Sequence, residues 1–374
     1  MTQKLLRELV ALPSVNPALL PAGHACAGEK SVAEFLAATA AQGGLDVAFQ
    51  DVLPGRPNLI VRLAPRGPVR RRLLLAPHLD TVAGDDEQFR PRVAGGRLYG
   101  RGACDTKGSV AAMLGALLSV AKNGKRPEET EIVFAGLVDE EVGHAGADAL
   151  VRAGWQADLA IVGEPTRLQV VTSHKGAVWL KLKTRGQSAH GSCPERGRNA
   201  VHEMARIVDA VETDYAATLR KTRPHPLLGH GTINVGSIRG GTQPNIVPDV
   251  CNATIDRRTL PGETERRVRA ELAAFLKHRG LRAEISALQS SAFGALETDP
   301  ALPWVRQFSR LAGQKKPAGV TFFCDASVLA ESGIPSVVFG PGDIAQAHTA
   351  DEWISLRSLD KAAGLLTRFM RELP

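Results

Sequence analysis

Residues 73–81 read Leu-Leu-Leu-Ala-Pro-His-Leu-Asp-Thr, a short apolar run that leads directly into a histidine and an aspartate. The run is too short for a helix and is bounded by proline, which indicates a strand buried on both faces. Similar apolar runs occupy residues 131–138, 159–162 and 335–339. Helical periodicity marks 29–42 and 109–122, which end at Gly-Gly and Asn-Gly. Buried strands that alternate with helices predict an α/β fold, with a mixed, mostly parallel sheet flanked by helices.

The pattern changes near Lys175. Residues 177–184 alternate apolar with polar or aromatic side chains, as expected of a strand with one buried face. The elements predicted next are a helix over 199–219, strands over 232–238 and 250–257, a helix over 263–278 and a strand over 281–288. This β-α-β-β-α-β order is that of a ferredoxin-like α+β domain. Layered α/β material then returns and ends in a helix over 358–373. We therefore expect residues 174–288 to be inserted into a larger domain made of 1–173 and 289–374.

Length and composition indicate an ordinary soluble, globular protein. Its 374 residues are 44% hydrophobic and 23% charged, which allows a large core and two domains. The start, residues 1–10, has the pattern of an amphipathic helix and not of a secretory signal, and no uncharged run is long enough to cross a bilayer. The five cysteines are odd in number and lack CxxC spacing, which argues against a disulfide framework or a thiolate metal site. We expect a cytoplasmic protein with no membrane partner.

The formal net charge of +7 raises the question of nucleic acid. Basic residues are, however, dispersed among acidic ones, and the densest run, 66–72, has the pattern of a solvated loop beside a strand. We expect no nucleic-acid partner. A mild positive excess suits a small anionic substrate, which it would steer toward the protein.

Five potential metal ligands share one predicted position, at the end of a buried strand or in the loop just after it: His78, Asp105, Glu141, Glu164 and His348. This edge is where open α/β sheets bind ligands. A single histidine or aspartate in a loop is usually solvated or caps a helix. Two histidines with three carboxylates, however, are what two divalent ions need if one carboxylate bridges them. A nitrogen and oxygen set without thiolates favours zinc, with cobalt or manganese as alternatives.

The motifs around these residues extend over nearly the whole chain. They are His78-Leu-Asp80-Thr-Val, Gly100-Arg-Gly-Ala-Cys-Asp105-Thr-Lys-Gly, Asp139-Glu-Glu141-Val-Gly, Gly163-Glu-Pro-Thr166, Ser188-Ala-His190, Gln243-Pro-Asn245, Asp256-Arg-Arg258-Thr-Leu-Pro-Gly262 and Gly340-Pro-Gly-Asp343 leading to His348-Thr-Ala-Asp-Glu352. In this order they resemble the M20 metallopeptidase family, particularly its acetylornithine deacetylase and succinyl-diaminopimelate desuccinylase branch. The resemblance implies a di-zinc exopeptidase-like catalytic domain, with the inserted domain as a lid and dimerisation domain.

The resemblance also assigns the metal ligands. His78 and Glu164 would hold one ion, Glu141 and His348 the other, and Asp105 would bridge the two. Asp80 would orient the imidazole of His78 and raise its basicity. The two residues are two positions apart in a segment that we expect to be extended, which places their side chains on one side.

The adjacent carboxylates of Glu140 and Glu141 are expected to have different roles. In an extended segment neighbouring side chains point to opposite sides, so one can bind metal while the other acts chemically. By the resemblance, Glu140 is the general base, which takes a proton from the attacking water and passes it to the leaving amine.

The resemblance assigns three residues of the inserted domain. His190 would stabilise the oxyanion of the tetrahedral intermediate, often in a neighbouring subunit's site, so we expect a homodimer formed through this domain. Asn245 and Arg258 match positions that grip the substrate carboxylate, a task that suits the planar guanidinium. The plainer interpretation of these two, a turn asparagine and a surface arginine, stays open.

The predicted activity is hydrolysis of the amide bond of a small N-acyl amino acid, such as N-acetylornithine or N-succinyl-diaminopimelate. A dipeptidase or carboxypeptidase of the same architecture is the alternative within enzymes. A metal-stabilised binding protein without catalysis is the alternative outside enzymes, and the presence of Glu140 beside a full ligand set disfavours it.

Overall fold

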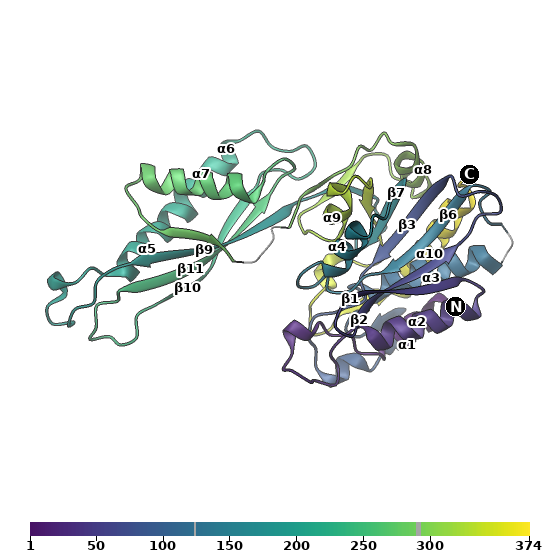
Figure 1. Ribbon diagram of the computed structural model, residues 1–374, viewed down its shortest axis with the longest axis horizontal. Coiled ribbons are helices and arrows are strands. Elements are labelled where there is room, and N and C mark those ends of the chain that lie inside the picture. Colours follow the sequence, from purple (N-terminus) through teal and green to yellow (C-terminus); the bar gives the residue numbers. More distant parts are fainter. Residues whose placement is uncertain (123–124, 289–292) are drawn as a thin grey trace. The chain divides into compact units, whose positions relative to one another are not determined.

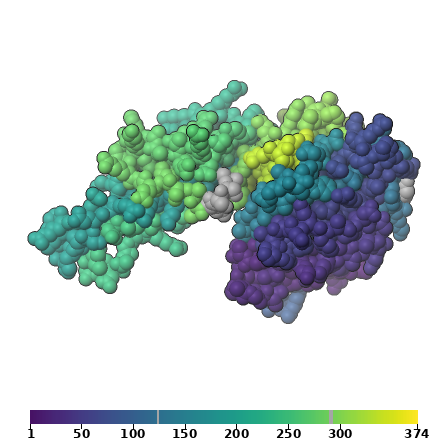
Figure 2. Space-filling model, viewed as in Figure 1, coloured from purple at the N-terminus to yellow at the C-terminus, as the bar shows by residue number. Residues whose placement is uncertain are grey.

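The computed structural model describes residues 1–122, 125–288 and 293–374, and they form two compact units. The first unit comprises Met1–Thr172, Thr298–Ala318 and Cys324–Pro374, and the second comprises Ser173–Glu297 with Gly319–Phe323. In Figure 2 the second unit is almost entirely teal and green, whereas the first combines purple, blue and yellow parts of the chain. The predicted domain boundary between residues 288 and 289 adjoins residues 289–292, which lie outside the described residues.

The first unit is built on a mixed sheet with the strand order β1-β2-β6-β3-β7-β15-β8-β13, and β14 also pairs with β8. Its strands are β1 (Asp46–Leu53), β2 (Arg56–Leu63), β3 (Arg71–Pro77), β6 (Thr130–Gly136), β7 (Leu159–Gly163), β8 (Val171–His174), β13 (Leu296–Glu297), β14 (Ala318–Val320) and β15 (Ser336–Val338). The four central strands, β6, β3, β7 and β15, run parallel to one another. The predicted mostly parallel central sheet is therefore confirmed.

Strands β6, β7 and β15 are buried along their whole length, and β3 is buried from Leu73 onward, because the side chains there are almost all apolar. The chain passes from β3 to its neighbour β6 on one side and then to β7 on the other side. Such a change of direction opens a crevice at the carboxyl ends of the strands. Sequence and structure differ slightly at β6, which ends at Gly136; Leu137 continues the pairing as an isolated β-bridge with His78, and the chain bends at Val138.

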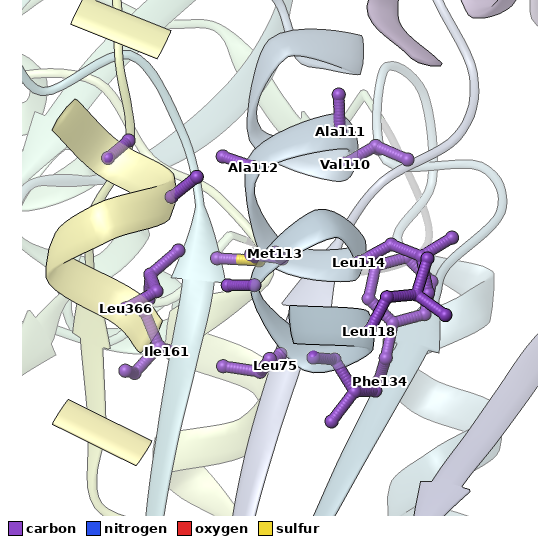
Figure 3. Packing of buried hydrophobic residues seen from close by; sticks show 14 of the residues in the cluster. Leu75, Val110, Ala111, Ala112, Met113, Leu114, Leu118, Phe134, Ile161 and Leu366 are labelled. Carbon is purple, nitrogen blue, oxygen red and sulfur yellow. The ribbon is translucent and has the colours of Figure 1, made fainter. Parts of the chain in front are cut away.

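Helices cover the sheet of the first unit. They are α1 (Thr2–Val10), α2 (Lys30–Gln42), α3 (Lys107–Lys122), α4 (Ala145–Arg152), α8 (Pro303–Leu311), α9 (Ala326–Glu331) and α10 (Leu356–Arg371). Helix α3 is buried almost throughout and packs against α10, α1 and the central strands. Figure 3 shows Leu114 and Leu118 of α3 over Phe134 of β6, and Leu366 of α10 beside Ile161 of β7. This packing fixes α3, and with it the loop that precedes it, against the parallel strands.

A small sheet with the order β16-β5-β4 completes the first unit. Its strands are β4 (Arg92–Ala94), β5 (Arg97–Tyr99) and β16 (Trp353–Ser355). It ties the segment just before the Asp105 loop to the segment just after His348, since Tyr99 pairs with Trp353.

The second unit has the predicted β-α-β-β-α-β order and an antiparallel sheet with the order β10-β11-β9-β12 (Figure 1). Its elements are β9 (Gly176–Arg185), α5 (Ala200–Ala210), α6 (Ala216–Lys221), β10 (Thr232–Gly240), β11 (Val250–Thr259), α7 (Glu265–His278) and β12 (Glu284–Ala287). Val178, Leu180 and Leu182 of β9 pack into a core with residues of α5 and α7. The predicted ferredoxin-like arrangement is confirmed.

The single helix predicted over 199–219 is interrupted. A π-helical turn, Val211–Tyr215, joins α5 to α6, and both of its end residues are buried. The carboxylate of Glu212 in this turn accepts a hydrogen bond from the backbone N–H of Val235 at 3.1 Å. The wider turn thus changes which side chains face the core, an effect that helical periodicity alone does not reveal.

Among the described residues, every helix is too short or too polar to cross a membrane. All five cysteines lie in this part of the chain, and each is a free thiol.

Candidate metal centre

The five predicted ligands all belong to the first unit and gather at one edge of its sheet. His78 directly follows β3, Glu164 directly follows β7, Glu141 lies in the turn after β6, and His348 lies in the loop after β15. Asp105 lies in the loop before α3. Because the four strands are parallel, their carboxyl ends meet at the same edge, which is why residues so far apart in sequence converge.

Asp105 lies between the two histidines. Its Oδ1 is 3.2 Å from Nε2 of His78, and its Oδ2 is 3.3 Å from Nε2 of His348. On one side, His78 Nε2 lies 3.6 Å from Oε1 of Glu164. On the other side, His348 Nε2 lies 3.1 Å from Oε2 of Glu141. One carboxylate therefore presents one oxygen to each of two histidine and glutamate pairs.

The cluster carries an excess of buried carboxylates. His78, Asp105 and Glu164 are buried, whereas the side chain of His348 is 54% exposed. Burial opposes the charge of Asp105, but hydrogen bonds to His348 and His78 hold its pKa well below the usual range. Hydrogen bonds to Asp105 and Glu141 raise the pKa of His348 to about 10. Burial, above all, raises the pKa of Glu164 well above its ordinary value. Such a set favours a bound cation.

The donor atoms fit divalent metal ions. Two groups have ligand atoms that all lie within 4.8 Å of one another: His78 with Glu140 and Glu164, and His78 with Asp105 and Glu141. Within the described residues, Oε1 of Glu141 and Oε1 of Glu164 are buried without a hydrogen-bond partner. Buried carboxylate oxygens without a hydrogen bond are costly, and a cation would satisfy them. Imidazole nitrogens and carboxylate oxygens suit zinc, cobalt or manganese.

Glu140 lies beside the cluster, with Oε2 3.9 Å from Nε2 of His78. Burial, and the charge of Glu164, raise its pKa well above the ordinary value, although the charges of His78 and His144 act in the opposite direction. The expectation that Glu140 and Glu141 are extended is wrong, because both lie in a turn that begins at Asp139, which has φ 71°. The turn nevertheless directs the two carboxylates to different partners.

Asp80 contacts both His78 and this turn. Its Oδ1 is 3.4 Å from Nδ1 of His78, which is also 3.0 Å from the Asp80 carbonyl oxygen. Its carboxylate accepts hydrogen bonds from the backbone N–H groups of Glu140 and Glu141, each at 3.1 Å, and from Nδ2 of Asn16 at 2.8 Å. Burial opposes its charge, but the hydrogen bond to His78 lowers its pKa.

Glu352 holds the Asp105 loop, a role that sequence reasoning did not assign. Its carboxylate is buried and accepts hydrogen bonds from the backbone N–H groups of Gly102 at 3.0 Å, Cys104 at 2.8 Å and Asp105 at 3.0 Å. Arg101 Nη1 donates to it at 2.8 Å. Gly102 has φ 79°, which glycine adopts without strain. The sequence feature that could have indicated this role is the position of Glu352 at the end of the motif that begins at His348.

His144 and Asp325 were also missed. They form a buried pair behind the Glu140 turn, with Nδ1 of His144 2.5 Å from Oδ1 of Asp325. Burial opposes the charge of the ring, but Asp325 raises the pKa of His144 to about 9. No local pattern links two residues so far apart in sequence.

His190 and Asn245 lie side by side in the second unit. Residue 190 forms a β-bridge with Ile246, and the N–H of Gly191 donates to the carbonyl oxygen of Asn245 at 2.7 Å. Both His190 and Asn245 are exposed. Nδ1 of His190 is 2.7 Å from the hydroxyl of Ser192, which orients the ring.

Arg258 lies at the other end of β11. It is eight residues from Val250, which at 3.3 Å per residue places it about 26 Å along the strand. Its guanidinium is paired with Asp256 at 2.9 Å and lies over the ring of Phe323, 5.2 Å from the ring centroid. Within the second unit, Arg258 is therefore not brought together with His190 and Asn245.

An α/β sheet whose carboxyl edge gathers two histidines, three carboxylates and a further, largely buried glutamate defines the class of metallohydrolases. The family described as Peptidase family M20/M25/M40 matches residues 74–372. Acetylornithine deacetylase from Myxococcus xanthus is 33% identical over 83% of this chain and 82% of its own length. Acetylornithine deacetylase from Salmonella arizonae (strain ATCC BAA-731 / CDC346-86 / RSK2980) is 31% identical over 98% of this chain and 96% of its own length. The chain belongs to peptidase family M20/M25/M40 and is a hydrolase.

Among solved structures, the M20 family metallo-carboxypeptidase Sso-CP2 from Sulfolobus solfataricus is similar with a TM-score of 0.78. The match covers 99% of this chain and 98% of that chain at 20% identity, so it shows the fold alone.

Proposed function

We propose that this protein is a di-metal hydrolase that cleaves the amide bond of small N-acyl amino acids, with N-acetylated amino acids such as N-acetylornithine as its substrates. The observation that carries the proposal is Asp105, whose two oxygens face His78 at 3.2 Å and His348 at 3.3 Å. The two relatives named acetylornithine deacetylase, at 33% and 31% identity, support the choice of acyl group.

The proposed ligands divide into two sets that share Asp105. His78 and Glu164 would hold one zinc ion, and Glu141 and His348 would hold the other. When bound, such ions polarise the amide carbonyl and lower the pKa of water from about 15.7 toward 7. The buried oxygens of Glu141 and Glu164 that lack a hydrogen bond support this assignment.

Glu140 is proposed to act as general base and then as general acid. Its raised pKa, caused mainly by burial, suits a group that accepts the proton of the attacking water and delivers it to the leaving amine. Asp80 would orient the ring of His78 through Nδ1 and hold the Glu140 turn through its backbone.

The second unit is proposed to act as a lid and as the surface of a homodimer. His190 would donate to the oxyanion, and Asn245 and Arg258 would bind the substrate carboxylate. The distance between Arg258 and the other two along β11 supports a site in which they come from different subunits, because one copy of this unit presents them at opposite ends of a strand.

A metal-reconstituted activity screen tests the proposal. The chain is stripped with a chelator, reloaded with zinc, cobalt or manganese, and assayed on N-acetylornithine, N-succinyl-diaminopimelate, other N-acetyl amino acids and dipeptides. We expect turnover only after metal is returned, with N-acetyl amino acids preferred. Faster hydrolysis of dipeptides would make the protein a dipeptidase. Two bound metals without turnover on the whole panel would refute the proposed activity.

A further inference from the structure

His144 and Asp325 lie immediately before two short helices of the first unit, α4 and α9 respectively. Nδ1 of His144 is 2.5 Å from Oδ1 of Asp325, and the two side chains are 4% and 1% exposed. Hydrogen bonds between a charged ring and a carboxylate are among the strongest in proteins. The pair therefore ties the end of the Glu140 turn to the start of α9.

The turn 139–144 needs such support, because its backbone conformation is unfavourable. Asp139 and His144 have φ values of 71° and 58°, in the left-handed region that non-glycine residues seldom adopt. The carbonyl oxygen of Asp139 accepts hydrogen bonds from the N–H groups of Gly143 at 2.9 Å and His144 at 2.7 Å. A Cβ at Gly143 would lie 2.6 Å from Oδ2 of Asp139. Strain of this kind persists only where surrounding contacts fix the backbone.

The start of the turn is fixed by charged side chains. The N–H of Asp139 donates to Oε1 of Glu29 at 3.1 Å, and Nη2 of Arg56 donates to Oδ1 of Asp139 at 3.1 Å. The N–H of Glu140 donates to Asp80 at 3.1 Å. At the far end, the side chain that leaves the turn for another element is His144, and its partner is Asp325.

We propose that His144 and Asp325 form a positioning pair, which fixes the far end of the turn 139–144 against α9 and so holds the carboxylate of Glu140 in place for proton transfer. Neither residue needs to touch the substrate. The inference rests on the proposed function, because it takes Glu140 as the general base.

Variants of the pair separate positioning from a general loss of stability. His144→Asn removes the ring, and asparagine tolerates the left-handed conformation better than alanine does. Asp325→Ala removes the carboxylate, whereas Asp325→Asn keeps an oxygen that accepts from the histidine ring. Glu131→Gln is the matched control: Glu131 lies in β6, at the end opposite the turn, and pairs with Arg72 at 2.7 Å.

We expect His144→Asn and Asp325→Ala to lower kcat by about 10- to 100-fold, since a misplacement of about 1 Å has effects of this size. KM and the content of two metals per chain should stay at wild-type values, Asp325→Asn should recover part of kcat, and Glu131→Gln should not change kcat. If the two single variants His144→Asn and Asp325→Ala are folded and metal-loaded and still have the wild-type kcat, the proposal is wrong.

Amide hydrogen exchange gives a readout that needs no turnover. The N–H groups of residues 139, 140, 141, 143 and 144 all have hydrogen-bond acceptors, so the peptide that contains them should be protected. We expect faster exchange in this peptide for His144→Asn and, to a smaller extent, for Asp325→Asn, with no change for Glu131→Gln. Unchanged exchange would also overturn the proposal.

The two measurements separate the two proposals. If the metal-loaded wild type hydrolyses nothing on the panel, the proposed function fails, and the exchange experiment still decides whether the pair holds the turn. If the wild type is active while the variants match it in kcat and in exchange, the positioning pair alone is wrong.

Discussion

The carboxylate of Asp80 accepts a hydrogen bond from the backbone N–H of Glu140 at 3.1 Å. Its other oxygen accepts from the N–H of Glu141 at the same distance, while Oδ1 also faces the ring of His78 at 3.4 Å. A single buried carboxylate thus sets the position of a proposed metal ligand, of a second ligand and of the proposed base. A change at Asp80 should affect metal binding and turnover together.

Asp80→Ala should lower metal affinity and kcat, each by about 10- to 100-fold, because partners that orient metal ligands have effects of this size. Asp80→Asn, which keeps one acceptor oxygen, should lose less. Competition with a chelator and steady-state kinetics measure the two quantities. The exposed Asp51→Ala in β1 serves as the control. Wild-type metal affinity in Asp80→Ala would contradict the role of this residue.

Glu140→Gln should keep two metals per chain and lose at least about 100-fold in kcat, the lower range of what a positioned general base contributes. The amide has nearly the same shape as the carboxylate but cannot accept a proton from water. Elemental analysis and steady-state assays on N-acetyl amino acids check the two parts. Glu87→Gln, an exposed carboxylate paired with Arg90, is the control. Turnover near the wild-type value would show that another residue acts as the general base.

The convergence of four of the five proposed ligands could be predicted because it depends on parallel strands, whereas Asp105 joins them from the loop before α3. Each apolar run is long enough for a strand, and each ends in a ligand or in a short loop that carries one, so the fold itself places them at one edge. The backbone of the turn 139–144 could not be predicted, because its left-handed residues are held by partners far away in sequence. His144 meets Asp325, and Asp139 meets Glu29 and Arg56.

Glu352→Ala should lower the free energy of unfolding by about 3–5 kcal/mol, because it leaves the buried Arg101 without its carboxylate. The Asp105 loop would lose the acceptor for three N–H groups as well. Urea unfolding followed by circular dichroism measures the loss. Glu128→Ala removes an exposed pair with Arg66 and should cost less than about 1 kcal/mol. Equal losses in the two variants would disprove the special role of Glu352.

Lys107 should make stability depend on pH. Burial lowers its pKa from 10.5 to about 7, and its Nζ donates to the carbonyl oxygens of Leu9 at 3.1 Å and Leu12 at 2.6 Å. Between these two pH values the unfolded chain binds the proton that the folded chain has released, so stability rises with pH by up to about 1.4 kcal/mol per unit. Below pH 7 both states are protonated and the slope disappears.

Lys107→Met has no such group, so the difference in unfolding free energy between wild type and Lys107→Met should grow in favour of wild type from pH 7 to pH 10. Denaturant unfolding at a series of pH values gives this difference. A difference that does not vary with pH would show that Lys107 keeps its ordinary pKa in the folded state.

In the second unit, the alternation of β9 predicted the sheet and its buried face correctly, because one face is in contact with helices and the other is not. The separation of Arg258 from His190 and Asn245 could not be predicted. The length of β11 determines this separation. A motif gives the order of residues along the chain, but not how far apart in space a strand places them.

The order of the ligands along the chain has a consequence for biosynthesis. His348 comes 184 residues after Glu164, and the whole second unit is translated between them. A nascent chain that has already folded β3, β6 and β7 still lacks the imidazole that faces Glu141. On the proposed ligand assignment, both cations can therefore be held by their full ligand sets only after His348 has been synthesised.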